Sequence, residues 1–144
     1  MLFFQLNQKK AFVAAVELGK RLEGKENVAC LLTEPFKHKE KLAAISPGMK
    51  TISAQKNIRA AIVYKSNFDF LAIESLTNGD CATGLLKTPE GYILVASVYL
   101  DINLDPAPAW LSRICEYASV KNYKLIMGLD SNAHSVLYLS LIHI

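Results

Sequence analysis

Four apolar segments of this chain each stop abruptly at polar side chains of the kinds that carry chemistry. Residues 2–6, 28–32, 92–98 and 123–129 are the apolar segments, and the residues that follow them are Asn7, Thr33 and Glu34, Tyr99, and Asp130 with Asn132. Short apolar runs bounded by polar residues are consistent with strands buried in a sheet. In open α/β sheets, ligands bind beyond the strand ends, where loops hold polar groups on a rigid frame. The pattern therefore predicts one shared site.

The spacing of apolar and turn-forming residues predicts an α/β (α+β) fold. The predicted order is strand 2–7, helix 10–23, strand 28–33, surface loop 36–50, paired strands 60–64 and 70–74, hairpin 80–87 and 92–99, helix 108–121 and strand 124–129. Pro89, Glu90 and Gly91 form the expected hairpin turn. Hairpins combined with flanking helices favour a mixed sheet over a doubly wound parallel one.

Each predicted helix has one apolar stripe. In the first helix the expected stripe contains Phe12, Val13, Val16 and Leu22. In the second helix, which follows a proline-rich segment, the expected face is Trp110, Leu111, Ile114 and Ala118. Two amphipathic helices of this kind are expected to cover sheet faces.

Composition and charge narrow the class of protein. The chain has 144 residues, 51% of them hydrophobic, which suits one globular domain with a single core. Residues 1–72 hold 12 Lys and Arg against 6 Asp and Glu, and residues 73–144 hold 4 against 7. A basic half beside an acidic site would suit a polyanionic substrate that needs a metal, although solvated surface lysines explain the same composition.

The cysteines and the length of the apolar segments indicate where in the cell the protein is expected. Three cysteines, Cys30, Cys81 and Cys115, share no spacing typical of metal ligands, and their odd number argues against a disulfide framework. No apolar stretch approaches the ~20 residues of a membrane span, and the N-terminal residues lack the basic leader of a signal peptide. We therefore expect an intracellular protein, nuclear or cytoplasmic, that is not secreted and not in a membrane.

Five motifs occur in a characteristic order. They are Leu6-Asn7-Gln8-Lys9-Lys10, Leu32-Thr33-Glu34-Pro35-Phe36, Ile58-Arg59-Ala60-Ala61-Ile62-Val63, Ser97-Val98-Tyr99-Leu100 and Asp130-Ser131-Asn132-Ala133-His134. In this order they resemble the endonuclease/exonuclease/phosphatase superfamily (DNase I-like), and in particular the apurinic-endonuclease-like domain of non-LTR retrotransposons. The resemblance implies a DNase I-like four-layer αββα sandwich with mixed sheets.

The resemblance covers residues 1–138 and stops short of a Ser-Asp-His motif that the family has further on. We therefore interpret the chain as the N-terminal portion of such a domain, incomplete at its C-terminus. Residues 139–144 depart from the family pattern, since Leu139 replaces a usual Gly, and we interpret them as a non-native tail.

The resemblance also implies roles for the strand-end residues. Glu34 is the expected main ligand of Mg²⁺ (or Mn²⁺), assisted by Asn7, because oxygen ligands select hard cations. Asp130 is expected to orient or deprotonate the attacking water, Asn132 to donate a hydrogen bond to the scissile phosphate, and Tyr99 to contact a phosphate oxygen. Lys9, Lys10 and Arg59 are weaker candidates for contacts with backbone phosphates.

Each residue also has an ordinary structural explanation. Asn7 could cap the following helix, Glu34 with Pro35 could end a strand, and Asp130 with Asn132 could form a turn. Tyr99 could be a half-buried aromatic. His134 is typical of a local loop hydrogen bond and is not assigned a catalytic role. Because four polar strand ends follow the family order, the joint pattern favours a site.

The function implied by the resemblance is Mg²⁺-dependent nicking of DNA, with DNA as partner and a reverse transcriptase domain expected in the full-length parent. The alternatives are a phosphatase of the same superfamily acting on small phosphoesters, and an inactive truncated fragment. Without the Asp and His of the Ser-Asp-His motif, the site would lack a charge-assisted contact with the phosphate. Contacts that stabilise transition-state charge change reaction rates by orders of magnitude.

Overall fold

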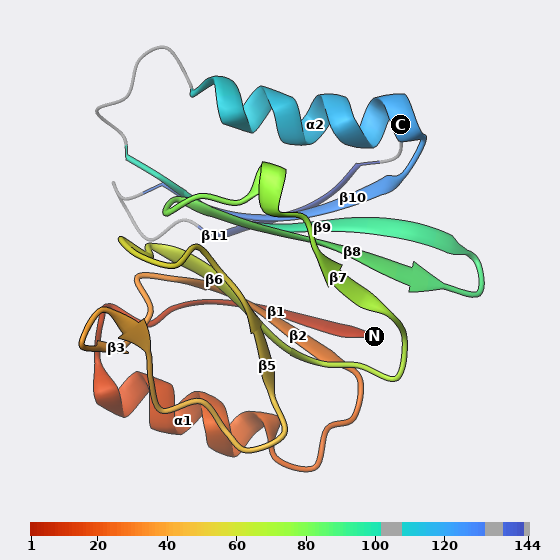
Figure 1. Ribbon diagram of the computed structural model, residues 1–144. Coiled ribbons are helices and arrows are strands. Elements are labelled where there is room, and N and C mark those ends of the chain that lie inside the picture. Colours follow the sequence, from red (N-terminus) through yellow and green to blue (C-terminus); the bar gives the residue numbers. More distant parts are fainter. Residues whose placement is uncertain (102–107, 132–136, 143–144) are drawn as a thin grey trace.

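The molecule is a sandwich of two sheets with one helix on each outer face (Figure 1). A computed structural model of the chain describes residues 1–101, 108–131 and 137–142, with side chains as far as residue 130. The first sheet has the order β1 (Leu2–Asn7), β2 (Val28–Thr33), β6 (Ala60–Lys65), β5 (Lys50–Ile52). The second sheet has the order β11 (Leu137–Ile142), β10 (Lys124–Ser131), β9 (Gly91–Leu100), β8 (Cys81–Thr88), β7 (Phe70–Ala72).

Both sheets are mixed, and each contains one parallel pair joined by a helix. Helix α1 (Phe12–Leu22) connects β1 to the parallel strand β2, and helix α2 (Ala109–Lys121) lies between β9 and the parallel strand β10. The remaining strand pairs are antiparallel, including a small hairpin of β3 (Lys37–His38) and β4 (Lys41–Leu42). The predicted αββα sandwich with mixed sheets is confirmed.

Alternation along β2 shows why the layers form. All six residues of this strand are buried. Val28, Cys30 and Leu32 pack towards α1, and Ala29 and Leu31 pack between the two sheets. A third cluster, which includes Leu94, Ile114 and Leu125, lies between α2 and the second sheet. A central strand buried on both faces is expected to be continuously apolar, as this one is.

The predicted pairing of strand 60–64 with strand 70–74 is wrong. The structure places β6 in the first sheet and β7 in the second, where β7 pairs with β8. Both edges of β6 are occupied, by β2 and by β5, so no edge is left for β7. The polar segment between β6 and β7 therefore crosses from one sheet to the other instead of forming a hairpin turn.

The segment predicted as a surface loop, 36–50, also contains β3 and β4, and β5 begins at Lys50. The predicted hairpin of 80–87 with 92–99 is confirmed as β8 and β9, with Thr88 opposite Gly91. Strand 124–129, predicted as the last, extends to Ser131 as β10 and is followed by β11. Whether residues 139–144 are native stays a prediction.

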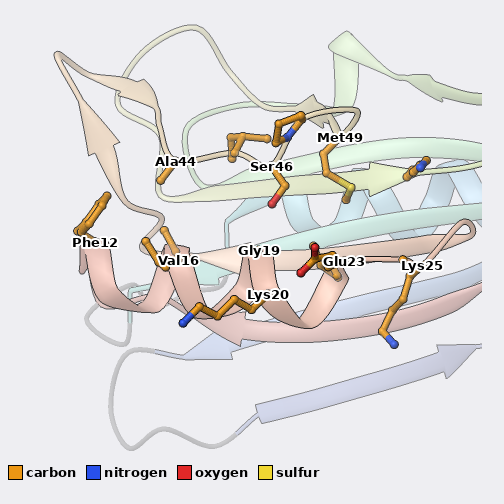
Figure 2. Close-up of a pocket in the computed structure, with 15 residues that line it drawn as sticks. Phe12, Val16, Gly19, Lys20, Glu23, Lys25, Ala44, Ser46 and Met49 are labelled. Atoms are coloured by element: carbon orange, nitrogen blue, oxygen red, sulfur yellow. The ribbon is translucent and has the colours of Figure 1, made fainter.

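The buried face of α1 differs from the predicted stripe. Ala15, Leu18 and Leu22 are buried, because they follow one another at the three- and four-residue spacing of a single helix face. The exposed fractions of the predicted residues Phe12, Val13 and Val16 are 57%, 71% and 37%. The Phe12 and Val16 side chains line a groove between α1 and residues 44–49 (Figure 2). The expectation for α2 is confirmed, with Ile114 and Ala118 fully buried. No helix in the described part of the chain is long and apolar enough to cross a membrane.

The two sheets approach each other closely at Gly128, which has no side chain. A Cβ added at Gly128 of β10 would lie 2.8 Å from Leu31 Cδ1 and 3.2 Å from Leu31 Cβ. We predict that Gly128→Ala lowers the free energy of unfolding by about 1–3 kcal/mol, because extra atoms in a packed core force neighbours to move. Urea unfolding measures this change in the free energy of unfolding. Ser112→Ala on the exposed side of α2 is the control, and equal stability of both variants would contradict tight inter-sheet packing.

The thiols give an independent check on burial. Burial raises the pKa of the Cys30 thiol to about 12, and burial also raises the pKa of the Cys81 thiol to about 11. Because the thiolate is the reactive form, we predict that alkylation of the folded chain at pH 8 modifies the half-buried Cys115 first. All three cysteines should react together in denaturant. Mass spectrometry of peptides measures this, and rapid labelling of Cys30 in the folded chain would show that the first sheet opens.

Candidate active site

The carboxyl ends of the two parallel strand pairs meet at one edge of the sandwich. In the first sheet Asn7 lies opposite Thr33, and in the second sheet Tyr99 lies opposite Asp130. The hydroxyl of Ser97, two residues before Tyr99, donates to the carbonyl of Leu32 across the sheet interface at 2.8 Å. The predicted strand ends therefore converge from both sheets.

One side-chain amide joins the two acidic residues of this edge. Asn7 Nδ2 donates to Glu34 Oε2 at 2.8 Å and to Asp130 Oδ2 at 2.7 Å. Asn7 and Asp130 are 123 positions apart in the chain and belong to different sheets. Asn7 Oδ1 accepts the Lys9 backbone N–H at 2.7 Å, which sets the orientation of the amide. The alternative that Asn7 caps the helix is wrong, since Ala11 occupies the N-cap and has no side-chain cap.

Asp130 is a buried carboxylic residue, with an exposed fraction of 2%. The Thr33 hydroxyl, itself 1% exposed, donates to Asp130 Oδ2 at 2.7 Å. A buried carboxylate is stable only when hydrogen bonds replace its hydration. Thr33 and Asn7 together supply two donors to one oxygen of Asp130, so the first sheet holds a residue of the second in place.

Glu34 adopts a backbone conformation that a residue with a side chain rarely takes, with φ of 45°. Its backbone N–H donates to Arg59 O at 2.9 Å, and its carbonyl accepts the Lys10 N–H at 2.8 Å. Such a conformation costs about 1–3 kcal/mol and persists where the surroundings determine it. The turn directs the Glu34 side chain towards Asn7 in place of continuing β2.

Tyr99 lies beside these groups and is 4% exposed. Burial raises the pKa of its hydroxyl above the usual value, the negative charge of Glu34 raises it further, and Arg59 opposes the shift. The Arg59 guanidinium carbon lies 4.8 Å from the centre of the Tyr99 ring, which is a cation–π distance. Tyr99 therefore remains a neutral hydroxyl, able to donate a hydrogen bond, at physiological pH.

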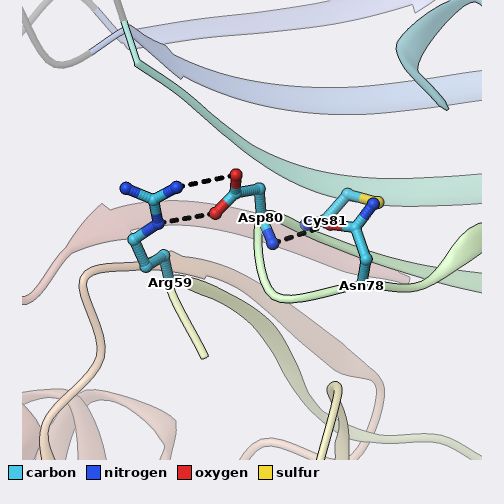
Figure 3. A network of polar contacts seen from close by, with 4 residues as sticks. All are labelled: Arg59, Asn78, Asp80 and Cys81. Carbon is cyan, nitrogen blue, oxygen red and sulfur yellow. Dashed lines mark hydrogen bonds and ion pairs between the residues drawn. The ribbon is translucent and has the colours of Figure 1, made fainter. Parts of the chain in front are cut away.

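Arg59 also forms a two-point ion pair with Asp80 (Figure 3). The Nε–Oδ1 distance is 2.6 Å and the second nitrogen–oxygen distance is 2.8 Å. Asn78 Oδ1 accepts the backbone N–H of Asp80, and the Asp80 carbonyl accepts the Tyr99 N–H. Arg59 thus ties the start of β6 to the loop that precedes β8, and its charge is already compensated.

The structure brings Asn7, Glu34 and Asp130 into direct contact and places Tyr99 beside them. Lys9 and Lys10 are exposed on the adjoining turn. Asn132 and His134 lie outside the described residues. The sequence interpretation named Thr33 as a strand end but gave it no role in the site, and it missed Asp80. Asp80 had no local signal, since its partner is 21 positions away.

The donor set fits a hard cation in kind. One carboxylate oxygen of Glu34 and one of Asp130 accept hydrogen bonds from the same nitrogen, the side-chain amide of Asn7. Carboxylate oxygens are ligands that hard cations prefer. Among the described residues there is no group of three or more His, Cys, Asp or Glu that could hold a metal. An ion at this edge would therefore keep several water ligands, as Mg²⁺ usually does.

Comparison with known proteins places the fold. No family model matches the chain. The chain is 27% identical over 140 residues to the putative 115 kDa protein in type-1 retrotransposable element R1DM of Drosophila melanogaster, which covers 96% of this chain and 14% of that protein. It is also similar to the solved endonuclease domain of TRAS1, a telomere-specific non-LTR retrotransposon, with a TM-score of 0.67 and 20% identity. That match covers 92% of this chain and 61% of that domain. The predicted DNase I-like fold and the resemblance to non-LTR retrotransposon endonuclease domains are confirmed.

We predict that Thr33→Val weakens the fold, because it removes the hydroxyl that donates to the buried Asp130. A lost hydrogen bond to a charged group costs about 1.5–3 kcal/mol. Chemical denaturation compares the variant with Thr51→Val, the same change at an exposed position of β5. Unchanged stability of Thr33→Val would show that the hydroxyl does not support Asp130.

Proposed function

We propose that this chain is part of a metal-dependent endonuclease domain that nicks DNA, from a retrotransposon protein. One observation carries the proposal: carboxylates from two separate sheets meet at the amide of Asn7, with Tyr99 beside them. These residues occupy the motif positions that resemble the family. The retrotransposon names of the similar proteins support the same class of activity.

Mg²⁺ or Mn²⁺ is the proposed cofactor, with Glu34 as its main ligand. Asn7 supports that ligand, because its amide nitrogen holds Glu34 Oε2 at 2.8 Å. When bound, a divalent cation supplies Lewis-acid polarisation of the phosphate and of the departing oxygen. The left-handed turn at Glu34 aims this side chain before any ion arrives, which reduces the cost of assembling the site.

The proposed roles of the other residues follow from their contacts. Asp130 orients the attacking water, since Thr33 and Asn7 hold one of its oxygens and leave the carboxylate fixed in direction. The Tyr99 hydroxyl donates a hydrogen bond to a phosphate oxygen, a role suited to the neutral phenol that burial favours. The role of Asn132 as a donor to the scissile phosphate stays a prediction from the resemblance.

DNA is the proposed substrate, and the rest of the parent protein is the proposed context. The chain spans about a seventh of the length of the curated relative that it matches, and less than two thirds of the solved domain. A reverse transcriptase domain elsewhere in the parent would use the 3′-hydroxyl at the nick as a primer. A nuclear or cytoplasmic location is part of this proposal.

We predict that the chain converts supercoiled plasmid to open circles with Mg²⁺, and that Glu34→Gln and Asp130→Asn each lower the rate by about 10²-fold or more. These changes keep the size of the side chain and remove its charge. Glu17→Gln, at an exposed position of α1, is the matched control and should leave the rate unchanged. Gel electrophoresis of the plasmid forms measures all four proteins.

A second arm of this experiment tests the phosphatase alternative. p-Nitrophenyl phosphate replaces the plasmid under the same conditions, and release of p-nitrophenol is followed by absorbance. Nicking that depends on both carboxylates, without p-nitrophenol release, would support the nuclease. Release of p-nitrophenol without nicking, or nicking that survives both substitutions, would overturn the proposal.

A further inference from the structure

A cleft adjoins the candidate active site on the side of the β3–β4 hairpin. Its walls come from five places in the fold: the turn after β1, strand β3, the loop that precedes β6, the loop that precedes β8, and the start of α2. Lys10, Lys37, Asn57 and Trp110 are the lining residues that matter here. No residue of this cleft belongs to the carboxylate cluster itself.

The cleft is continuous with the active site through two residues. Lys10 lines the cleft, and its backbone N–H donates to the Glu34 carbonyl at 2.8 Å. Arg59 also lines the cleft, and its guanidinium lies over the Tyr99 ring at 4.8 Å. A chain molecule with its reacting group at Glu34 and Tyr99 would therefore extend into this space.

The charges of the cleft select an anion. Asp80 compensates Arg59 through the two-point ion pair (Figure 3). Lys10 and Lys37 form no ion pair with another described residue, and Lys10 is exposed. The cleft therefore presents two uncompensated cations next to an acidic centre. The repeated phosphate groups of a nucleic-acid strand match these two lysines, because each lysine can neutralise one phosphate.

Trp110 adds a flat apolar wall to the same space. It is the only tryptophan of the chain, it is half-buried, and part of it packs on the core beneath α2. Indole rings bind nucleotides by stacking, irrespective of base identity. An aromatic surface facing two lysines is the combination that a nucleotide requires, with its base or sugar on the ring and its phosphate on the amines.

We propose that this cleft is a nucleotide subsite, which holds the DNA residue next to the scissile phosphodiester between Trp110 and the pair Lys10 and Lys37. The proposal rests on the proposed nuclease function and adds to it the direction in which the strand leaves the active site. Arg59 is a positioning residue in this arrangement, because Asp80 already holds its guanidinium over the Tyr99 ring. The lysines and the indole make the new contacts.

The single tryptophan provides a test that needs no catalysis. An oligonucleotide is titrated into the chain with EDTA present, and the fluorescence of Trp110 is followed at several salt concentrations. We expect quenching on binding. We expect Lys10→Ala and Lys37→Ala each to weaken binding at least about fivefold and to reduce the slope of log affinity against log salt by about one.

Matched controls separate the subsite from general attraction to a basic protein. Lys50→Ala and Lys121→Ala remove exposed lysines outside the cleft and should change affinity less than twofold. Trp110→Phe keeps an aromatic ring and should raise KM for nicking with kcat retained, whereas a merely structural effect would lower kcat as well. Anisotropy of labelled DNA replaces fluorescence for this variant.

The outcomes distinguish the two proposals. Quenching that Lys10→Ala and Lys37→Ala weaken supports the subsite even if nicking fails, and that failure counts against the nuclease alone. Nicking that depends on Glu34, combined with unchanged Trp110 fluorescence or equal effects of all four lysine substitutions, would overturn the subsite and leave the nuclease proposal standing.

Discussion

The side-chain amide of Asn7 holds together two acidic residues that would otherwise repel each other. Its nitrogen donates to Glu34 at 2.8 Å, directly after β2 of the first sheet, and to Asp130 at 2.7 Å in β10 of the second sheet. Thr33 adds a second donor to Asp130 from the first sheet. Because like charges brought close are costly in a low-dielectric interior, the site depends on this shared donor and on the packing that brings the sheets together.

That packing follows from a strand–helix–strand unit with parallel strands, which occurs once in each sheet. In each sheet a helix connects two parallel strands, so the carboxyl ends of both strands lie on one side. Gly128 leaves room for Leu31, and the Ser97 hydroxyl reaches the Leu32 carbonyl, so β2 sits directly against β9 and β10 near their ends. Four strand ends therefore share one edge, although the ends of β1 and β2 are 67 to 124 positions from those of β9 and β10.

Charge is divided around this edge in a way that suits one kind of ligand. The edge carries the carboxylates of Glu34 and Asp130, while the adjoining cleft carries Lys10 and Lys37 without acidic partners among the described residues. Arg59 lies at the boundary and belongs to the framework, since Asp80 and Tyr99 occupy its guanidinium. A ligand that needs a metal cation at one phosphate and lysines at the next fits the carboxylate edge and the adjoining cleft together.

The two helices, the polar residues at strand ends and the strands other than β3, β4, β5 and β11 were readable from the sequence. Burial leaves apolar runs and periodic stripes that are local. Helix α2 and the β8–β9 hairpin illustrate this. The sequence did not show which sheet β7 would join or which face of α1 would be buried. β7 joins the second sheet because β2 and β5 already occupy both edges of β6. Helix α1 turns Leu18 to the core and Phe12 to the surface. The contact of Asn7 with Asp130 and the ion pair of Arg59 with Asp80 likewise came from tertiary structure alone, since side chains distant in the chain become neighbours only after the sheets have packed.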